Sequence, residues 1–437
     1  MTKKILFWFR RDLRLEDNAG LFEALKTGLP VIPLFIFDTT ILSKLENKSD
    51  RRVNFIIQAL QEIDRKLKPL GTRLCIKQGI PSAVLQSLTD KGDVSAVYAN
   101  RDYEPYARKR DEELSKLLSA RNVDFHTVKD QVIFEPAEIL KSDRTPYTVY
   151  TPYSKAWRKS FQESMVASFP SESLNNFSSD IPQSDVHELA DTGFQPSGLV
   201  FTPPVIPLTL LPHYHTTRNI PAMEGTSGLS VHLRFGTISI RRLVQVAFET
   251  NDTWLGELIW REFFMMILFH FPYVAERSFK PAYDFIPWRN NEEEFSRWCH
   301  GQTGYPIVDA GMRELLATGR MHNRVRMITA SFLTKHLLID WRWGEAWFAK
   351  HLLDFDLSAN NGNWQWAAGC GCDAAPYFRI FNPYEQTKKF DIRLQYVGKW
   401  IPELDTPNYP NPIVEHKVAR ERALAIYKLG LESAKNR

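Results

Sequence analysis

Short apolar runs alternate with helix-spaced apolar positions over residues 1–130. Five runs are rich in β-branched and aromatic residues and have the length of buried strands: 5–9, 31–37, 73–77, 94–98 and 123–128. Between them, positions such as Val53, Ile57 and Leu60 fall on one face of a helix. The alternation predicts a βαβ series, hence a Rossmann-like parallel sheet with right-handed crossovers.

The pattern changes twice further along the chain. Residues 131–208 become polar and proline-rich, above all over 170–208, which is typical of a connector. From residue 209 strand patterns nearly disappear, and long helical patterns follow at 254–271, 323–339 and 414–431. We therefore expect an α/β domain at 1–130, an interdomain linker at 131–208 and an all-α domain at 209–437.

The turn after the first strand has an unusual composition. It reads Arg-Arg-Asp-Leu-Arg over residues 10–14, with no Gly-x-Gly-x-x-Gly. The glycines of that fingerprint are what let a dinucleotide pyrophosphate approach the helix start. The sequence therefore excludes the usual dinucleotide motif at this turn.

Composition narrows the class of protein. The chain has 437 residues, of which 43% are hydrophobic and 24% charged, as in globular proteins of two or three domains. No apolar run approaches the length of a membrane span, and the start does not read as a signal peptide. Four scattered cysteines do not form a disulfide framework or a metal site. We expect a cytoplasmic protein without a membrane or metal partner.

The net charge of +4 is too small for a bulk polycation. Any contact with nucleic acid must come from a local patch. The candidate cations in the C-terminal half are Arg218, Arg234, Arg324, Lys388 and Lys389, whereas Arg241 and Arg242 are interpreted as a solvated helix face.

Residues 254–264 carry the first candidate chemistry. On a helix, Trp254, Glu257 and Arg261 share a face, with Trp260 to one side of Glu257. Arg261 could bind one ligand while Glu257 and Trp260 contact a second ligand beside it. The alternative is a buried aromatic helix with an internal Glu257–Arg261 ion pair.

Two further stretches are dense in polar residues. Residues 224–230 read Glu-Gly-Thr-Ser-Gly-Leu-Ser, which suits a phosphate at a helix start or a plain N-cap by Ser227 or Ser230. Residues 354–366 place two carboxylates, the amides of Asn360 and Asn361 and two tryptophans within thirteen residues. So many polar groups are costly to bury without a polar ligand, and Trp364 and Trp366 would face nearly opposite sides of a helix.

Five ordered motifs together resemble the photolyase/cryptochrome family. They are Phe-Trp-Phe-Arg-Arg-Asp-Leu-Arg-Leu-Glu-Asp-Asn at 7–18, Gly-Thr-Ser-Gly-Leu-Ser at 225–230, and the stretches 254–264, 321–330 and 354–383. They extend over nearly the whole chain, with the best match in the helical domain and the weakest in the linker.

The resemblance implies FAD held in the helical domain. Arg261 matches a phosphate-side position, Arg326 and Asp354 match a pair flanking the isoalloxazine, and Asn360 matches the residue beside flavin N5. The full set of implied cofactor residues is Tyr214, Thr226, Ser227, Gly228, Leu229, Ser230, Trp254, Arg261, Asn323, Arg326, Asp354, Phe355, Asp356 and Asn360.

The resemblance also implies two further sets of residues. Trp364, Trp341 and Trp288 fall on the positions of a relay that photoreduces the flavin. A pocket for the pyrimidine dimer, with DNA contacts around it, is implied at the positions Arg218, Glu257, Trp260, Asn323, Arg324, Met327, Trp366 and Gln386. Within it, we expect Glu257 to hydrogen-bond a pyrimidine carbonyl.

Three positions separate the branches of the family. The branch that repairs (6-4) photoproducts has paired histidines where this chain has Asn323 and Met327. Plant-type cryptochromes carry a carboxylate, and the animal light-sensing type a cysteine, where this chain has Asn360. The resemblance therefore implies a light-driven carbon–carbon lyase that repairs cyclobutane pyrimidine dimers in UV-damaged DNA.

Several alternatives stay open at this point. The rival functions are a cryptochrome-type light sensor without repair activity and a non-photochemical helical protein that binds FAD or DNA. A second, light-harvesting chromophore in the α/β domain could be a folate, a deazaflavin or a flavin, and an empty antenna domain is a further alternative. We expect a monomer with no obligate protein partner.

Overall fold

The computed structural model describes residues 3–435 and divides into two compact units. The first unit consists of Met1–Glu138, Ser160–Ile206 and Gly228–Glu249, and the second of Ile139–Lys159, Pro207–Ser227 and Thr250–Arg437. Both units are discontinuous along the chain, and the three consecutive segments expected from the sequence stay a prediction. No helix in residues 3–435 is long and apolar enough to cross a membrane.

The five strands found within residues 3–435 all lie in the first unit. They are β1 Lys4–Phe9, β2 Val31–Asp38, β3 Cys75–Gly79, β4 Val94–Asn100 and β5 Asp124–Val128. The helices are α1 Ala19–Lys26, α2 Thr39–Leu42, α3 Arg51–Leu67, α4 Pro81–Thr89, α5 Pro105–Ser119, α6 Tyr150–Ser160, α7 Tyr214–Thr217, α8 Ser230–Phe235, α9 Ile240–Thr250, α10 Asp252–His270, α11 Glu292–Cys299, α12 Pro306–Thr318, α13 Asn323–Ser331, α14 Trp341–His351, α15 Leu357–Ala368, α16 Pro383–Phe390, α17 Gln395–Trp400 and α18 His416–Lys435.

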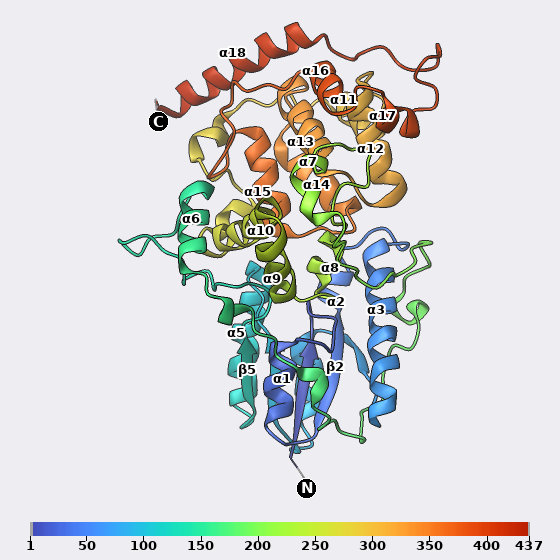
Figure 1. Cartoon of the computed structure of the whole chain (residues 1–437), viewed down its shortest axis with the longest axis vertical. Coiled ribbons are helices and arrows are strands. Elements are labelled where there is room, and N and C mark those ends of the chain that lie inside the picture. Colours follow the sequence, from blue (N-terminus) through green and yellow to red (C-terminus); the bar gives the residue numbers. More distant parts are fainter. Residues whose placement is uncertain (1–2, 436–437) are drawn as a thin grey trace. The chain divides into compact units, whose positions relative to one another are not determined.

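The strands form one parallel sheet in the order β3-β2-β1-β4-β5, which confirms the predicted βαβ architecture (Figure 1). Successive side chains of a strand point to opposite faces. Leu6 and Trp8 of β1 therefore pack in one cluster with Leu85 of α4 and Leu114 of α5. Phe7 faces the other side, where Gly20 allows α1 to approach the sheet. Helices on both faces make this a doubly wound unit.

The carboxyl ends of β1 and β4 meet where the strand order reverses, the usual ligand position in such sheets. Here a buried polar network fills the space. Asn100 donates through Nδ2 to Asp12 Oδ2 at 2.6 Å and to Asn18 Oδ1 at 2.7 Å. Burial raises the pKa of the Asp12 carboxyl. The polar residues after β1 are thus structural, in agreement with the missing dinucleotide fingerprint.

Arg241 is a buried residue of the first unit, 3% exposed. Its guanidinium pairs with Asp17 and Asp130, each at 2.8 Å. Arg14 pairs with the same Asp130 at 2.7 Å. The interpretation of Arg241 as part of a solvated face was therefore wrong. The sequence pattern did not reveal its burial because the carboxylates that pair with it lie far away in the sequence.

The second unit is helical, as the sequence predicted, and α15 lies at its centre. Gly362 brings α15 against Phe264 of α10, since a Cβ there would lie 2.1 Å from the Phe264 ring. Gly344 of α14 does the same against Trp364 of α15. The helix expected over 323–339 ends earlier. α13 stops at Ser331, and a π-helical turn, Phe332–His336, follows before Leu338 adopts a φ of 52°.

Part of the polar density in 354–366 is structural. Asn361 and Gln365 both donate through their amide nitrogens to the carbonyl of Val274, at 2.8 and 2.9 Å. At the other end of α15, the buried Lys335 ammonium donates to the carbonyl of Ala368 at 2.9 Å. These contacts fix α15 without a ligand and leave Asp354, Asp356 and Asn360 to be explained.

The buried His336, paired with the half-buried His416, is expected to make the second unit sensitive to acid. His336 Nε2 lies 2.8 Å from Nδ1 of His416, and Arg422 donates to the His336 carbonyl. Burial, together with the charges of His416 and Arg422, lowers the pKa of His336 to about 3. The unfolded chain takes up this proton below about pH 6.5, whereas the folded chain does so only near its lowered pKa.

We therefore expect the free energy of unfolding to fall as the pH drops from about 6.5 towards 3, by at most about 1.4 kcal/mol per pH unit from this group. Urea titrations at several pH values measure the slope. His336→Phe should flatten it, whereas substitution of the exposed His300 by glutamine should not. Equal slopes in all three proteins would contradict the assignment.

Candidate active site

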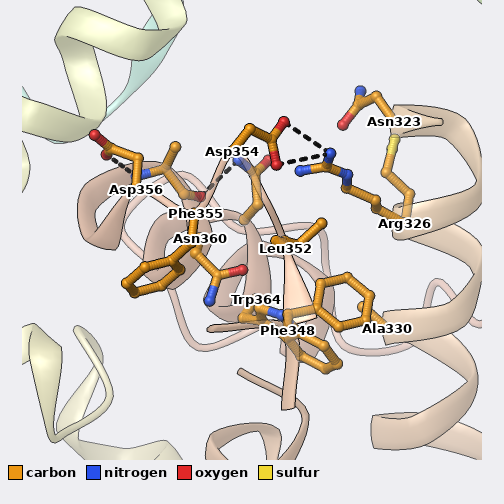
Figure 2. Close-up of a pocket in the computed structure, with 13 residues that line it drawn as sticks. Asn323, Arg326, Ala330, Phe348, Leu352, Asp354, Phe355, Asp356, Asn360 and Trp364 are labelled. Atoms are coloured by element: carbon orange, nitrogen blue, oxygen red, sulfur yellow. Dashed lines mark hydrogen bonds and ion pairs between the residues drawn. The ribbon is translucent and has the colours of Figure 1, made fainter. Parts of the chain in front are cut away.

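A cavity of about 530 Å³, counting the space at its open mouth, lies in the second unit. Its walls come from α13, α14, α15 and the segment before α15 (Figure 2). The lining residues are Asn323, Arg326, Met327, Ala330, Phe348, Leu352, Asp354, Phe355, Asp356, Ala359, Asn360, Asn363 and Trp364.

An ion pair forms one side of the cavity. Arg326 Nη2 donates to both carboxylate oxygens of Asp354, at 3.1 and 2.9 Å (Figure 2). Arg326 Nε donates to the carbonyl of Met321 at 2.8 Å, which fixes the guanidinium plane. The predicted Arg326–Asp354 pair is thus present, and it presents one positive and one negative group to the cavity.

Asn360 lies on the first turns of α15 and is 9% exposed. Its Nδ2 donates to the backbone carbonyl of Glu345 at 3.1 Å and to its carboxyl Oε1 at 2.8 Å. Within residues 3–435 no hydrogen bond engages Asn360 Oδ1, so this oxygen is the acceptor at the cavity wall. Burial raises the pKa of the Glu345 carboxyl. Glu345 therefore sets the direction of the amide.

The remaining wall combines a helix cap with an apolar surface. Asp356 is the N-cap of α15 and accepts from Ala359 N at 3.2 Å and from the Ser358 hydroxyl. Phe348 packs edge-to-face on Trp364, with 5.0 Å between ring centroids. Such a cavity, apolar with an ion pair and a fixed amide oxygen, suits a flat heteroaromatic ring with a polar edge.

Sequence reasoning missed part of this cavity. Glu345 was not predicted because its role depends on Asn360, fifteen residues away. Phe348 on α14 and Leu352, the C-cap of that helix, follow an ordinary amphipathic pattern and carried no signal of their own. The lining residues absent from the prediction are Ala330, Phe348, Leu352, Ala359 and Asn363.

Other predicted cofactor residues lie outside this cavity. Tyr214, Thr226, Ser227, Trp254 and Arg261 belong to the second unit but do not line it. Gly228, Leu229 and Ser230 belong to the first unit. Leu229 is the N-cap of α8 and makes no side-chain capping bond, so the N-cap falls on neither Ser227 nor Ser230. The cofactor roles of these residues stay predictions.

Glu257 forms an ion pair with Arg218. This contact differs from the internal Glu257–Arg261 pair considered from the sequence. Burial raises the pKa of the Glu257 carboxyl, and the adjacent Arg218 guanidinium opposes the rise. Nearby, Arg324 donates to Asn219 at 2.8 Å and lies 4.4 Å from the ring centroid of Phe390.

The three relay candidates belong to one hydrophobic cluster. Trp341 and Trp364 are 1% and 2% exposed, and the half-buried Trp288 packs against the same cluster, as does Trp366. Trp364 also lines the cavity. On α14, Trp341 and Gly344 are three residues apart, and Gly344 abuts the Trp364 ring. The cluster thus extends from the cavity wall to half-buried Trp288.

Comparison with known proteins places these features in a family. A model described as DNA photolyase matches residues 5–173, and one described as the FAD binding domain of DNA photolyase matches residues 254–407. A Synechococcus protein named deoxyribodipyrimidine photo-lyase is 38% identical, covering 98% of this chain and 97% of its own.

Solved structures agree with this result. A bacterial class III photolyase from Agrobacterium tumefaciens superposes with a TM-score of 0.88 at 34% identity, covering 99% of this chain and 98% of its own. A cryptochrome from Synechocystis superposes with a TM-score of 0.82 at 26% identity, covering 98% and 99%. The second unit carries the FAD-binding domain of this fold. The chain therefore belongs to the DNA photolyase family.

Proposed function

We propose that this protein repairs cyclobutane pyrimidine dimers in UV-damaged DNA, driven by blue light, with FAD in the cavity of the second unit. The observation that carries the proposal is Asn360, whose amide is held by Glu345 with its oxygen at the cavity wall. A neutral acceptor there suits a reduced flavin, whose N5 carries a proton. The similarity to proteins named deoxyribodipyrimidine photo-lyase supports the same reaction.

The residues present fit FAD. When bound and reduced, FAD supplies light absorption and the electron that opens the dimer. The Arg326–Asp354 pair offers a donor and an acceptor to the polar edge of the ring system. Phe348, Leu352 and Trp364 exclude water from its apolar face. We further assign Trp364, Trp341 and Trp288 as the relay that restores the reduced cofactor.

The lesion pocket in this proposal comprises Glu257, Trp260 and Trp366, with Asn323, Arg324 and Met327 at its edge. A flipped-out dimer would stack on the tryptophan rings, and such stacking contributes about 1–3 kcal/mol per base. Arg218, Arg324 and Gln386 are assigned to DNA contacts. Lys388 and Lys389 are exposed on α16 and suit phosphate groups.

Glu257 has a defined task in this pocket. A carboxylate only accepts hydrogen bonds, whereas a neutral carboxyl group also donates one, which a pyrimidine carbonyl requires. Burial favours the neutral form, and Arg218 favours the charged one. Attraction of Arg218 to DNA phosphates would reduce its stabilisation of the charged form and shift the carboxyl towards the neutral form that can donate.

We therefore expect Glu257→Ala to lower dimer affinity or repair quantum yield by about 3- to 10-fold, the value of one hydrogen bond. Glu257→Gln keeps a donor at the same place and should retain most of both. Exposed Glu293→Ala is the control. Normal dimer binding together with an unchanged quantum yield in Glu257→Ala would refute the role.

A light sensor without repair activity is the second candidate, favoured by the structural similarity to a cryptochrome. Asn360 argues against it, since the sensing branches carry an acid or a cysteine there. Assay of a thymine-dimer oligonucleotide and a (6-4) oligonucleotide with photoreduced enzyme decides between them. Light-dependent recovery of thymine absorbance for the first substrate alone supports the proposal. A photoreducible yellow protein inactive on both would be a sensor.

We also propose a second chromophore, a folate, a deazaflavin or a flavin, in the first unit. The Arg110 guanidinium there lies 4.7 Å from the Trp8 centroid and 5.7 Å from that of Tyr106. Because Trp8 is 2% exposed, a chromophore ring could stack on it only by displacing the guanidinium. The absorption spectrum of the purified protein identifies the chromophore. A monomeric state and a cytoplasmic location complete the proposal.

A further inference from the structure

Tyr150, the first residue of α6, stacks on Trp260 of α10 within the second unit. The two ring centroids are 3.6 Å apart and the ring planes differ by 7°. Trp260 is further held by Phe263, edge-on at 5.6 Å, and by Phe264 at 5.4 Å. One face of the indole is therefore covered by a parallel tyrosine ring from a different segment of the chain.

Two hydrogen bonds fix the tyrosine in this position. Its hydroxyl donates to the carbonyl of Gly256 at 2.8 Å, one turn before Trp260 on the same helix. A Cβ at Gly256 would lie 3.5 Å from this hydroxyl, so the residue leaves room for the ring to lie flat. The backbone nitrogen of Tyr150 donates to Asp373 Oδ2 at 2.8 Å.

These contacts connect two parts of the lesion pocket. Gly256 and Trp260 belong to α10, whereas Asp373 follows α15, the helix that carries Trp366. A half-buried tryptophan without a neighbour exchanges between rotamers. When a base stacks on such a ring, the side chain loses this rotamer freedom, and the entropy loss weakens binding. A ring already stacked and hydrogen-bonded to the scaffold removes that cost.

We propose that Tyr150 is a positioning residue for dimer recognition, which holds the Trp260 ring in the orientation that stacks a flipped-out pyrimidine dimer. The proposal rests on the proposed function, in which Trp260 is a wall of the lesion pocket. Tyr150 does not touch the dimer itself. Its effect is on the affinity for damaged DNA and not on contacts with intact duplex.

The test compares the dissociation constants of Tyr150→Leu for a thymine-dimer oligonucleotide and for the same undamaged sequence. The dimer complex should weaken by about 2- to 10-fold, the range for one aromatic pair, with undamaged DNA unchanged. Tyr150→Phe keeps the stack and should restore the affinity. The near-ultraviolet circular dichroism of the indole should decrease in the leucine variant and return in the phenylalanine variant.

Two controls keep the outcome unambiguous. Tyr147→Leu removes a ring that lies edge-on to Tyr153 and should have no effect on dimer affinity. Tyr150→Met repeats the experiment should the leucine variant not fold. In the double variant with Trp260→Leu, loss of Tyr150 should add nothing to the loss of Trp260.

The single variants separate the two claims. If Trp260→Leu binds the dimer normally, the pocket assignment fails and the role of Tyr150 fails with it. If Trp260→Leu weakens dimer binding and Tyr150→Leu does not, the inference alone is overturned. Equal weakening of damaged and undamaged complexes by Tyr150→Leu would also overturn it.

Discussion

Replacing Gly344 with alanine lowers the free energy of unfolding by about 1–3 kcal/mol, the cost of overpacking a core. The new Cβ would lie 2.1 Å from Trp364 Cη2 and 2.5 Å from Leu333 Cδ2. Neither neighbour can move freely, because Trp364 is 2% exposed and Leu333 is fully buried. The indole must shift towards the cavity, so we also expect less retained FAD and slower photoreduction.

Thermal unfolding, the FAD content after purification and flash photoreduction measure these effects. Gly398 is the matched control, since it too lies within a helix and a Cβ there meets nothing within 4 Å. Gly398→Ala should be neutral or stabilise by about 0.4–1 kcal/mol. If Gly344→Ala and Gly398→Ala changed stability and FAD content equally, Gly344 would not be required for the close packing of α14 on Trp364.

Replacing Arg326 with leucine is expected to lower the free energy of unfolding by about 3 kcal/mol. This value is the lower end of the range for breaking a buried ion pair. The lower end applies because the Arg326 side chain is 27% exposed while that of Asp354 is 8% exposed. The Asp354 carboxylate then faces the cavity without its partner. If FAD uses the pair, its dissociation constant should rise about 100-fold.

Reconstitution of the apoprotein with FAD, followed by flavin fluorescence, measures this affinity. Lys428→Gln breaks an exposed pair with Glu432, whose side chains are 71% and 57% exposed, and should change stability by less than about 1 kcal/mol. Unchanged FAD affinity in Arg326→Leu would remove the pair from the cofactor site.

Local patterns were enough to predict the elements but not their partners. The five strands and most long helices follow from hydrophobic periodicity, which is a property of neighbouring residues. Arg241 gave no such signal, because burial of its charge depends on Asp17 and Asp130. The polar density of residues 354–366 suggested a ligand, but Asn361 and Gln365 both donate to the carbonyl of Val274, which is distant in the sequence.

The candidate site divides in the same way. Arg326, Asp354 and Asn360 were predicted from motif resemblance, and all three line the cavity. Glu345 was not, since nothing in its own neighbourhood distinguishes it from a surface acid on α14. Tyr150 begins α6, within residues 131–208 that the sequence assigned to the linker, so its stack on Trp260 could only come from the three-dimensional structure.

The discontinuous first unit has a consequence for synthesis on the ribosome. Asp130 lies 111 residues before Arg241, its buried partner. Translation adds about 5–20 residues per second, so Arg241 is synthesised roughly 5–20 s after Asp130. During that interval the nascent first unit has its sheet but not α9, the helix that carries Arg241. Chaperone binding to stalled chains should therefore decline only after residue 241 has left the exit tunnel.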